Sequence, residues 1–147
     1  MRDRVTRVSD GDTLRLEKLG SVRLVGVDTP EVNYQGKAQP GGREAGEFLR
    51  NALLDREVEV KLCDKRPYDR YGRGLAFVYA TNPGGRRVLV NQEIIRQGYG
   101  RVYSLRPCTV NESEWGALYE EARRNRRGLF ATLGDVPDAA DFRRETR

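Results

Sequence analysis

Apolar and polar residues alternate in several short stretches of the first 90 residues, and a period of two is typical of β-strands that bury one face. The pattern predicts strands at Val5–Val8, Thr13–Leu16, Val22–Val27, Val58–Leu62 and Gly74–Tyr79, with a further apolar run at Val88–Val90. Turn signals lie between strands, at Asp10–Gly11 and at Asn82–Gly85. Short strands joined in this way predict a small antiparallel barrel.

Three later segments carry apolar residues at helical spacing instead. The first is Arg43–Leu54, and the second is Asn91–Gln97, which Gly98 is expected to stop. Asn111 is expected to cap a third helix that Gly128 ends. The predicted fold class is therefore α+β, rich in β-structure, with three α-helices.

The chain has 147 residues, which is a typical length for one domain. Residues 1–132 carry the periodic pattern and are predicted to form that domain. From residue 133 the sequence loses its periodicity and becomes polar, so residues 133–147 are expected to form a flexible tail. No stretch approaches the ~20 apolar residues that cross a bilayer, so we expect a protein that does not enter a membrane. We also expect it to be a monomer.

Charge and composition narrow the possible chemistry. The 27 Lys and Arg residues exceed the 22 Asp and Glu residues, which mildly favours an anionic partner, although an ordinary solvated surface explains the same balance. The chain has no histidine, the commonest general base and metal ligand, and its two cysteines lack the spacing of a structural zinc site. Any hydrolysis must therefore use carboxylates, guanidinium groups and a hard cation.

Two acidic stretches, Asp10–Thr13 and Val27–Glu31, lie about 15 residues apart at predicted turns or strand ends. An Asp-Gly turn also has an ordinary explanation in backbone preference. Asp28, however, is followed by a threonine, a proline and a glutamate in a loop, where burial does not dictate residue type. Carboxylate and carbonyl oxygens suit calcium. The candidate calcium ligands are Asp12, Asp28 and the Thr29 carbonyl, and the candidate proton acceptor is Glu31.

Two arginines are candidates for holding a phosphate, because a guanidinium binds two oxygens at once and keeps its charge. Arg23 interrupts an apolar strand, and Arg73 stands at the start of another. Outward-facing strand arginines would explain each of them equally well. Tyr71 and Tyr103 are candidates for stacking on a base, with a packing role as the alternative, and Arg70 is a candidate for backbone phosphates.

In order, spacing and chemistry, these residues resemble the staphylococcal nuclease, or thermonuclease, family from about Val5 to Phe130. The motifs that carry the resemblance are Asp10–Thr13, Arg23–Glu31, Arg43–Ala45, Asp69–Ala76 and Val90–Asn91. The resemblance implies a five-stranded OB-fold barrel with three α-helices. It also implies a calcium-dependent endonuclease that hydrolyses the phosphodiester bonds of DNA and RNA with little sequence preference and leaves 3′-phosphate ends.

The resemblance carries family roles onto positions of this chain. The implied metal ligands are Asp12, Asp28 and the Thr29 carbonyl, the catalytic residues are Arg23, Glu31 and Arg73, and the substrate-binding residues are Arg70, Tyr71, Tyr103 and Lys37. Two departures stand out. The segment around Tyr103 is one residue shorter than the family's tyrosine-rich stretch, and the basic loop before the first helix holds a single lysine, Lys37, which predicts a weaker grip on the substrate.

The family fold further implies that Cys63 lies near Cys108. A disulfide between them would indicate an oxidising compartment, and we accordingly expect a protein that is secreted or held in the cell envelope after removal of a leader. Two buried thiols in a cytoplasmic protein are the alternative.

Two other functions compete with an active nuclease. The same fold supports a catalytically weak module that binds nucleic acid or protein, which loss of the charged catalytic residues would mark. A single-strand binder of the OB type would instead carry several exposed aromatic residues interleaved with basic ones along its strands. The full set of catalytic residues favours the nuclease.

Overall fold

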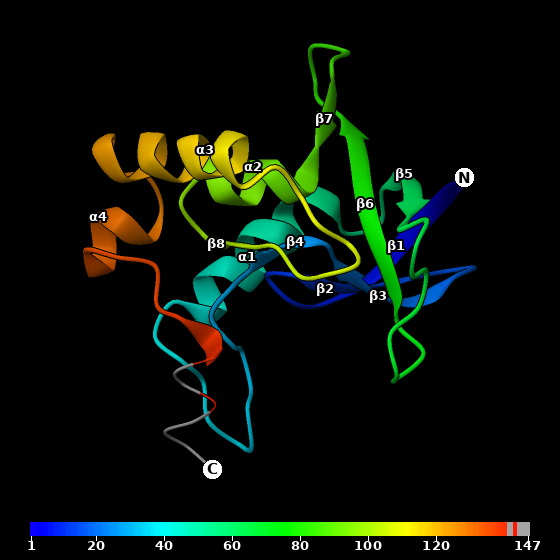
Figure 1. Ribbon diagram of the computed structural model, residues 1–147, viewed down its shortest axis with the longest axis horizontal. Helices are drawn as coiled ribbons and strands as arrows, with labels where there is room; N and C mark the ends of the chain where they lie inside the picture. Colours follow the sequence, from blue (N-terminus) through cyan, green and yellow to red (C-terminus); the bar gives the residue numbers. More distant parts are fainter. Residues whose placement is uncertain (141–142, 144–147) are drawn as a thin grey trace.

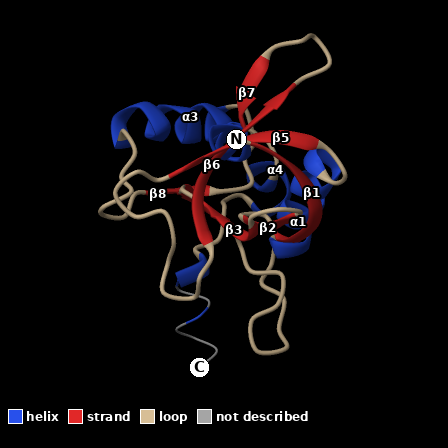
Figure 2. Cartoon of the chain, turned by 90° about the vertical axis from the view of Figure 1, so that its right-hand side faces the viewer, coloured by secondary structure: helices blue, strands red, loops and turns tan. Residues whose placement is uncertain are grey.

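The computed structural model describes residues 1–140 and 143, and its centre is a closed β-barrel (Figures 1 and 2). Five strands form the barrel: β1 (Arg2–Asp10), β2 (Thr13–Leu16), β3 (Gly20–Leu24), β5 (Glu57–Leu62) and β6 (Gly74–Thr81). Neighbours in the order β3-β2-β1-β5-β6 run antiparallel, and a parallel pairing of β3 with β6 closes the ring. The five-stranded barrel is confirmed, but it is mixed rather than purely antiparallel.

The stretch Val22–Val27, predicted as a single strand, is divided between two sheets. Beyond β3, strand β4 (Gly26–Asp28) pairs with β8 (Arg101–Tyr103) in a separate two-stranded sheet. Gly26 has a φ of 85°, and a Cβ added there would lie 2.5 Å from a ring carbon of Trp115. Only glycine allows both the turn and the close approach, so the chain leaves the barrel at this residue. The turn directs Asp28 toward the end of the barrel.

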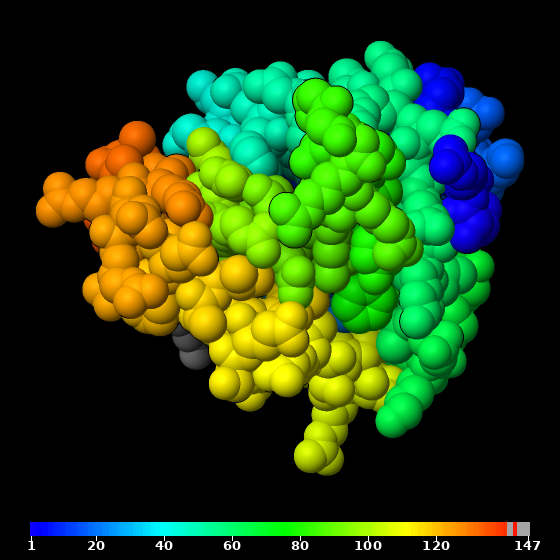
Figure 3. Space-filling model, turned by 90° about the horizontal axis from the view of Figure 1, so that it is seen from above, coloured from blue at the N-terminus to red at the C-terminus, as the bar shows by residue number. Residues whose placement is uncertain are grey.

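The helices follow the sequence prediction in order, with one addition. They are α1 (Gly42–Leu53), α2 (Val90–Arg96), α3 (Glu112–Arg124) and α4 (Leu129–Leu133). The side chain of Asn111 accepts a hydrogen bond from the N–H of Glu114 at 3.0 Å, which confirms the predicted cap. Helix α4 was not predicted, because five residues are too few to show a helical period. In Figure 3, the orange C-terminal helices and the blue N-terminal strands lie at opposite ends of the molecule.

Strand β7 (Arg87–Leu89) extends β6 into a hairpin that projects from the barrel (Figure 1). Its position corresponds to the apolar run predicted at Val88–Val90, except that the last residue of that run begins α2.

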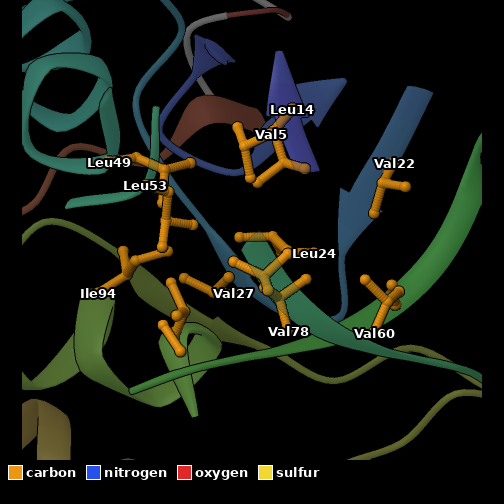
Figure 4. Packing of buried hydrophobic residues seen from close by; sticks show 14 of the residues in the cluster. Val5, Leu14, Val22, Leu24, Val27, Leu49, Leu53, Val60, Val78 and Ile94 are labelled. Atoms are coloured by element: carbon orange, nitrogen blue, oxygen red, sulfur yellow. The ribbon is translucent and has the colours of Figure 1, made fainter. Parts of the chain in front are cut away.

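The hydrophobic core fills the barrel and continues under two helices (Figure 4). The labelled core residues are Val5, Leu14, Val22, Leu24, Val27, Leu49, Leu53, Val60, Val78 and Ile94. Leu49 and Leu53 come from α1 and Ile94 from α2, so these helices pack against the strands. Residues that alternate along the strands therefore place one set of side chains inside and expose the other.

A disulfide joins Cys63 at the end of β5 to Cys108 in the loop after β8. Their Cα atoms lie 6.0 Å apart, and both residues are buried beside Val25. The pairing implied by the family resemblance is present.

The range predicted to be a flexible tail includes buried residues. Val136 is 0% exposed and packs with α4, and Ala139 is 1% exposed. The backbone carbonyl of Val136 accepts a hydrogen bond from Arg101. Residues 141, 142 and 144–147 of that range lie outside the described part of the chain.

Among the described residues, none of the helices has the length and apolar character needed to cross a membrane.

Candidate active site

A cleft of about 890 Å³ opens at the end of the barrel, where the β1–β2 turn, the end of β4 and the loop before β6 meet. Eight of the ten residues that the sequence singles out as functional line this cleft: Asp12, Arg23, Asp28, Glu31, Arg70, Tyr71, Arg73 and Tyr103. The structure therefore brings together segments that are up to 91 residues apart in the sequence, from Asp12 to Tyr103.

The innermost part of the cleft holds two carboxylates on either side of one guanidinium. Nη2 of Arg23 lies 3.5 Å from Oδ2 of Asp12 and 3.2 Å from Oδ1 of Asp28. Asp12 comes from the β1–β2 turn and Asp28 from the end of β4, and both are buried. Because the strands fix these three residues, the cluster is preorganised.

Arg23 is held by the backbone as well as by the carboxylates. Its Nη1 donates to the carbonyl oxygens of Leu24 and Val27, each at 2.8 Å. These bonds bridge the turn at which the chain passes from β3 to β4, so the turn and the guanidinium orient each other. An outward-facing strand arginine, the alternative that the sequence left open, would lack such contacts.

Hydrogen bonds stabilise the charged form of Asp12. The N–H of Thr29 donates to Oδ2 at 2.9 Å, and the hydroxyl of Thr13 donates to Oδ1 at 3.0 Å. Burial alone would raise the pKa of Asp12, but the positive charge of Arg23 and these hydrogen bonds outweigh it and lower the pKa overall.

The neighbouring carboxyl groups shift in the opposite direction. Burial, together with the negative charge of Asp12, raises the pKa of Asp10 to about 8 and the pKa of Asp28 to about 7. The cluster therefore contains more carboxylate charge than the Arg23 guanidinium balances.

Glu31 lies at the outer side of this cluster, in the loop after β4. Its backbone N–H donates to Oε1 of Gln39 at 3.0 Å, and its carbonyl accepts from the N–H of Gln39 at 2.9 Å. Its carboxylate forms an ion pair with Arg143, whose guanidinium also lines the cleft. The charge of Asp28 contributes to raising the pKa of Arg143 despite its partial burial.

Asp69 holds Arg73, which lines the cleft just before β6, the strand that pairs with β3. One Asp69 oxygen accepts from Nε of Arg73 at 2.7 Å, and the other accepts from the backbone N–H groups of Arg73 and Tyr71, each at 2.9 Å. These bonds lower the pKa of Asp69 against the effect of burial. The Asp-Arg-Tyr-Gly-Arg segment is thus a closed turn that aims Arg73 into the cleft.

The rim of the cleft carries exposed tyrosines and arginines. Tyr71 is 69% exposed, and the guanidinium carbon of Arg70 lies 4.8 Å from the centre of its ring. Tyr103 is also exposed, at the end of β8 opposite Gly26. Their exposure argues against the packing role that the sequence left open for both tyrosines.

Two of the ten residues lie apart from the cleft lining. Lys37 is exposed in the loop before α1, where it bridges to Tyr34. The side chain of Thr29 is buried, and among the described residues its Oγ1 has no hydrogen-bond partner. The Thr29 backbone nevertheless contacts the acidic cluster through its N–H.

Comparison with known proteins identifies the family of this chain. The sequence model described as Staphylococcal nuclease homologue matches residues 21–132. The chain belongs to the staphylococcal nuclease family. It is 37% identical to a protein named thermonuclease from Staphylococcus hyicus over 132 residues, 87% of this chain and 75% of the relative. A thermonuclease from Staphylococcus intermedius is 34% identical over 124 residues, 82% of this chain and 68% of the relative.

A third relative is named an uncharacterized endonuclease from Escherichia coli O157:H7. It is 35% identical over 137 residues, which cover 91% of this chain and 80% of the relative. The range matched to the family includes Arg23, Asp28, Glu31 and Arg73, whereas Asp12 and Arg143 lie on either side of it.

The family resemblance implies calcium, and the donors in the cleft fit a hard cation. Asp12 and Asp28 supply carboxylate oxygens, and burial together with the negative charge of Asp12 raises the pKa of Asp28, so a divalent ion there would balance the charged form. The described residues contain no group of three or more acidic, histidine or cysteine side chains arranged to hold a metal. An ion would therefore need main-chain oxygen, for which Thr29 is the candidate, and water to complete its ligands.

Three residues of the site were not predicted from the sequence. Asp69 has a weak signal, because aspartate favours the first position of a tight turn. Gln39 offers none, since its role depends on a glutamate eight residues away and on the carbonyl of Asp138, to which its Nε2 donates at 3.1 Å. Arg143 lies in a stretch without periodicity, so only the fold reveals its position.

Proposed function

We propose that this protein is a calcium-dependent endonuclease that hydrolyses phosphodiester bonds of DNA and RNA with little sequence preference and leaves 3′-phosphate ends. One observation carries the proposal. Asp12 and Asp28 converge on Arg23 within a cleft that Glu31 and Arg73 also line. The names of the relatives, two thermonucleases and one uncharacterized endonuclease, support the same class of reaction.

Different residues of the cleft are suited to different roles in phosphodiester hydrolysis. Arg23 and Arg73 both line the cleft from neighbouring strands, since β3 pairs with β6 directly after Arg73, so a phosphate bound there would meet two guanidinium groups that can bond its oxygens. Glu31 is the carboxylate at the edge of the cluster, where it can accept a proton from an attacking water. A calcium ion, when bound at Asp12 and Asp28, would supply positive charge to a phosphate oxygen and to that water.

The rim supports low sequence preference. Tyr71 and Tyr103 present aromatic faces on which any base can stack, and Arg70 is placed for backbone phosphates. Stacking and phosphate contacts tolerate both deoxyribose and ribose, which supports activity on DNA and RNA.

A cleavage assay with product analysis tests the proposal. Purified protein is incubated with plasmid, single-stranded DNA and RNA in calcium, magnesium or chelator, and the ends of the products are identified. We expect cleavage of all three substrates in calcium, none in chelator, and 3′-phosphate ends. Arg73→Ala and Glu31→Gln should each slow cleavage by at least about 100-fold.

A matched control distinguishes a catalytic loss from a general loss of charge. Arg124→Ala removes an exposed arginine from the last turn of α3, outside the cleft lining, and should cleave at the parental rate. If the parent binds all three nucleic acids but cleaves none of them, the protein is instead a binding module, and the proposal is wrong.

The disulfide supports a working location outside the reducing cytoplasm, either secreted or in the cell envelope. We further propose that the protein acts as a monomer, because one chain supplies every residue of the proposed site.

A further inference from the structure

The described C-terminal residues reach the candidate catalytic glutamate. Arg143 forms an ion pair with Oε1 of Glu31, with side chains that are 34% and 19% exposed. The two residues are 112 positions apart in the sequence, so the contact depends on how the segment after α4 packs. Nothing in the proposed chemistry requires an arginine at this place.

Apolar packing holds the start of the C-terminal segment, residues 135–140. Val136 is fully buried against α4 and its neighbours. Arg101, which pairs with Asp28 in the β4–β8 sheet, donates to the Val136 carbonyl and forms an ion pair with Asp135 at 3.1 Å. Tyr119 of α3 donates to the other Asp135 oxygen at 3.0 Å. These contacts bind the segment to the sheet that carries Asp28.

The side chain of Gln39 also joins this segment to the loop that carries Glu31. Gln39 is buried, its Oε1 accepts the backbone N–H of Glu31, and its Nε2 donates to the carbonyl of Asp138. Figure 1 shows the red C-terminal stretch running beside the cyan loop that precedes α1. The amide side chain of Gln39 therefore links the backbone of Glu31 to that of Asp138, five positions before Arg143.

We propose that Arg143 is a positioning residue that holds the Glu31 carboxylate in the orientation used for hydrolysis. This inference rests on the proposed nuclease function. The ion pair engages Oε1, so the second oxygen is the one that can order and deprotonate a water.

The local charges explain why such a partner is needed. Glu31 faces Asp28 and Asp12, whose carboxylates contribute mutual repulsion within the cleft. Without a nearby guanidinium, this repulsion favours rotation of the Glu31 side chain toward solvent. A catalytic group displaced by about 1 Å loses on the order of 100-fold in rate. Arg143 opposes that rotation through its ion pair with Glu31, and the described residues before it are held by the burial of Val136 and by the hydrogen bond from Gln39 to Asp138.

Kinetics of full-length variants test the inference. The variants are Arg143→Ala, Arg143→Lys, Glu31→Gln, the double variant Glu31→Gln/Arg143→Ala and the control Arg124→Ala. Each is assayed for kcat and KM on a short fluorescent single-stranded oligonucleotide in calcium. The Kd for the same oligonucleotide is measured in chelator, where no cleavage occurs, as a readout that does not depend on activity.

A positioning role predicts a specific pattern. Arg143→Ala should lower kcat by about 10- to 100-fold and leave both KM and the Kd in chelator within about twofold of the parent. Arg143→Lys should recover part of the rate, since it restores the charge without the planar fork. The double variant should be no slower than Glu31→Gln alone, because Arg143 acts only through that glutamate. Arg124→Ala should match the parent.

Five results would overturn the inference. Equal rates for Arg143→Ala and the parent would mean that the ion pair does nothing for catalysis. A raised KM and Kd with unchanged kcat would make Arg143 a phosphate contact, and a faster Arg143→Ala enzyme would make the ion pair inhibitory. A comparable rate loss in Arg124→Ala would reduce the effect to overall charge. A parent that does not cleave at all would instead refute the proposed function, and this inference with it.

Discussion

Two buried aspartates, Asp28 and Asp3, have opposite pKa shifts because their surroundings differ. Burial and the negative charge of its neighbours raise the pKa of Asp28, whereas Asp3 accepts enough hydrogen bonds that its pKa falls despite burial. The first arrangement is costly unless a cation balances it, and the second stabilises the fold directly. Charge at the second site therefore serves structure, and charge at the first is suited to the cation that we propose there.

Removing the charge of Asp28 should weaken calcium binding. Asp28→Asn keeps the shape of the side chain but deletes one of two candidate carboxylate ligands, and the affinity of oxygen-ligand sites depends on their charge. We expect at least an about tenfold rise in the Kd for calcium, measured by isothermal titration calorimetry. The control Asp55→Asn, at an exposed position after α1, should bind calcium like the parent. Equal affinity of Asp28→Asn and the parent would exclude Asp28 from the ligands.

Removing the charge of Asp3 should instead lower the free energy of unfolding. Its carboxylate accepts from the backbone N–H groups of Arg4 at 2.8 Å, Lys18 at 3.0 Å and Leu19 at 2.9 Å, and so fixes the β2–β3 turn to β1. Asp3→Asn replaces an acceptor oxygen with an NH₂ group that faces these donors. We expect a loss of about 1–3 kcal/mol at pH 7, measured by urea denaturation.

The pH dependence gives the Asp3 prediction its sign. A carboxyl group whose pKa is lower in the folded chain than its ordinary 3.8 stabilises the fold above that pH and loses this contribution as the pH falls through its folded value. The difference between the parent and Asp3→Asn should therefore shrink once the pH drops below 3.8. A difference that stays constant from pH 7 to pH 2 would show that packing, not charge, stabilises this turn.

Among the secondary-structure elements, those that pattern alone predicted are the ones that bury a regular face. Barrel strands such as β2 and the helix over Gly42–Leu53 follow from period-2 and helical spacing. The division at Gly26 did not follow, because it depends on contact with Trp115, 89 residues later in the chain. Arg143 was missed for the same reason. Its partner Glu31 lies 112 positions earlier in the chain, and no local period marks the residues around it.

The candidate site shows the same division. The acidic motif and the two arginines of the cleft, Arg23 and Arg73, could be found from residue type and spacing, because the chemistry restricts which side chains are suitable. The groups that hold them, such as Asp69 and Gln39, are ordinary polar residues whose roles appear only when distant segments come together. Sequence reasoning therefore identified the candidate residues of the cleft better than the residues that hold them in place.

Helix α2 is joined to the barrel by a buried side chain that should be sensitive to substitution. Asn91 is 0% exposed, its Nδ2 donates to the carbonyls of Val25 and Ala76, and its Oδ1 accepts from the N–H of Val78. Asn91→Leu conserves volume but removes the side-chain partner of the Val78 N–H and the donor to the Val25 and Ala76 carbonyls, of which the Ala76 carbonyl still accepts from the N–H of Val25 at 2.9 Å. We expect a loss of about 2–5 kcal/mol in urea denaturation.

An exposed asparagine in another helix provides the comparison for Asn91. Asn51→Leu, in α1, makes the same chemical change where water satisfies the neighbouring groups, and its stability should stay within about 0.5 kcal/mol of the parent. Similar losses at both positions would mean that the hydrogen bonds of Asn91 contribute no more than a surface amide.

At the scale of the whole molecule, the disulfide connects the barrel to the rim of the cleft. Cys63 directly follows β5, and Cys108 lies in the loop that follows Tyr103 and lines the cleft. The bond therefore restrains both the unfolded chain and the loop next to the proposed substrate site. Arg23 and Asp28, by contrast, lie on strands β3 and β4, which do not need this restraint to stay in place.

Breaking the disulfide should accordingly destabilise the fold. The bond closes a loop of 45 residues, for which the chain-entropy model gives about 4 kcal/mol. We expect Cys63→Ser/Cys108→Ser to lose about that amount in urea denaturation, and the parent treated with dithiothreitol to lose a similar amount, whereas dithiothreitol should not change the double variant. The reductant thus serves as an internal control, because the two routes remove the same covalent link. If the parent unfolds at the same urea concentration with and without dithiothreitol, the bond does not stabilise the protein, and the argument for an oxidising compartment loses its physical basis.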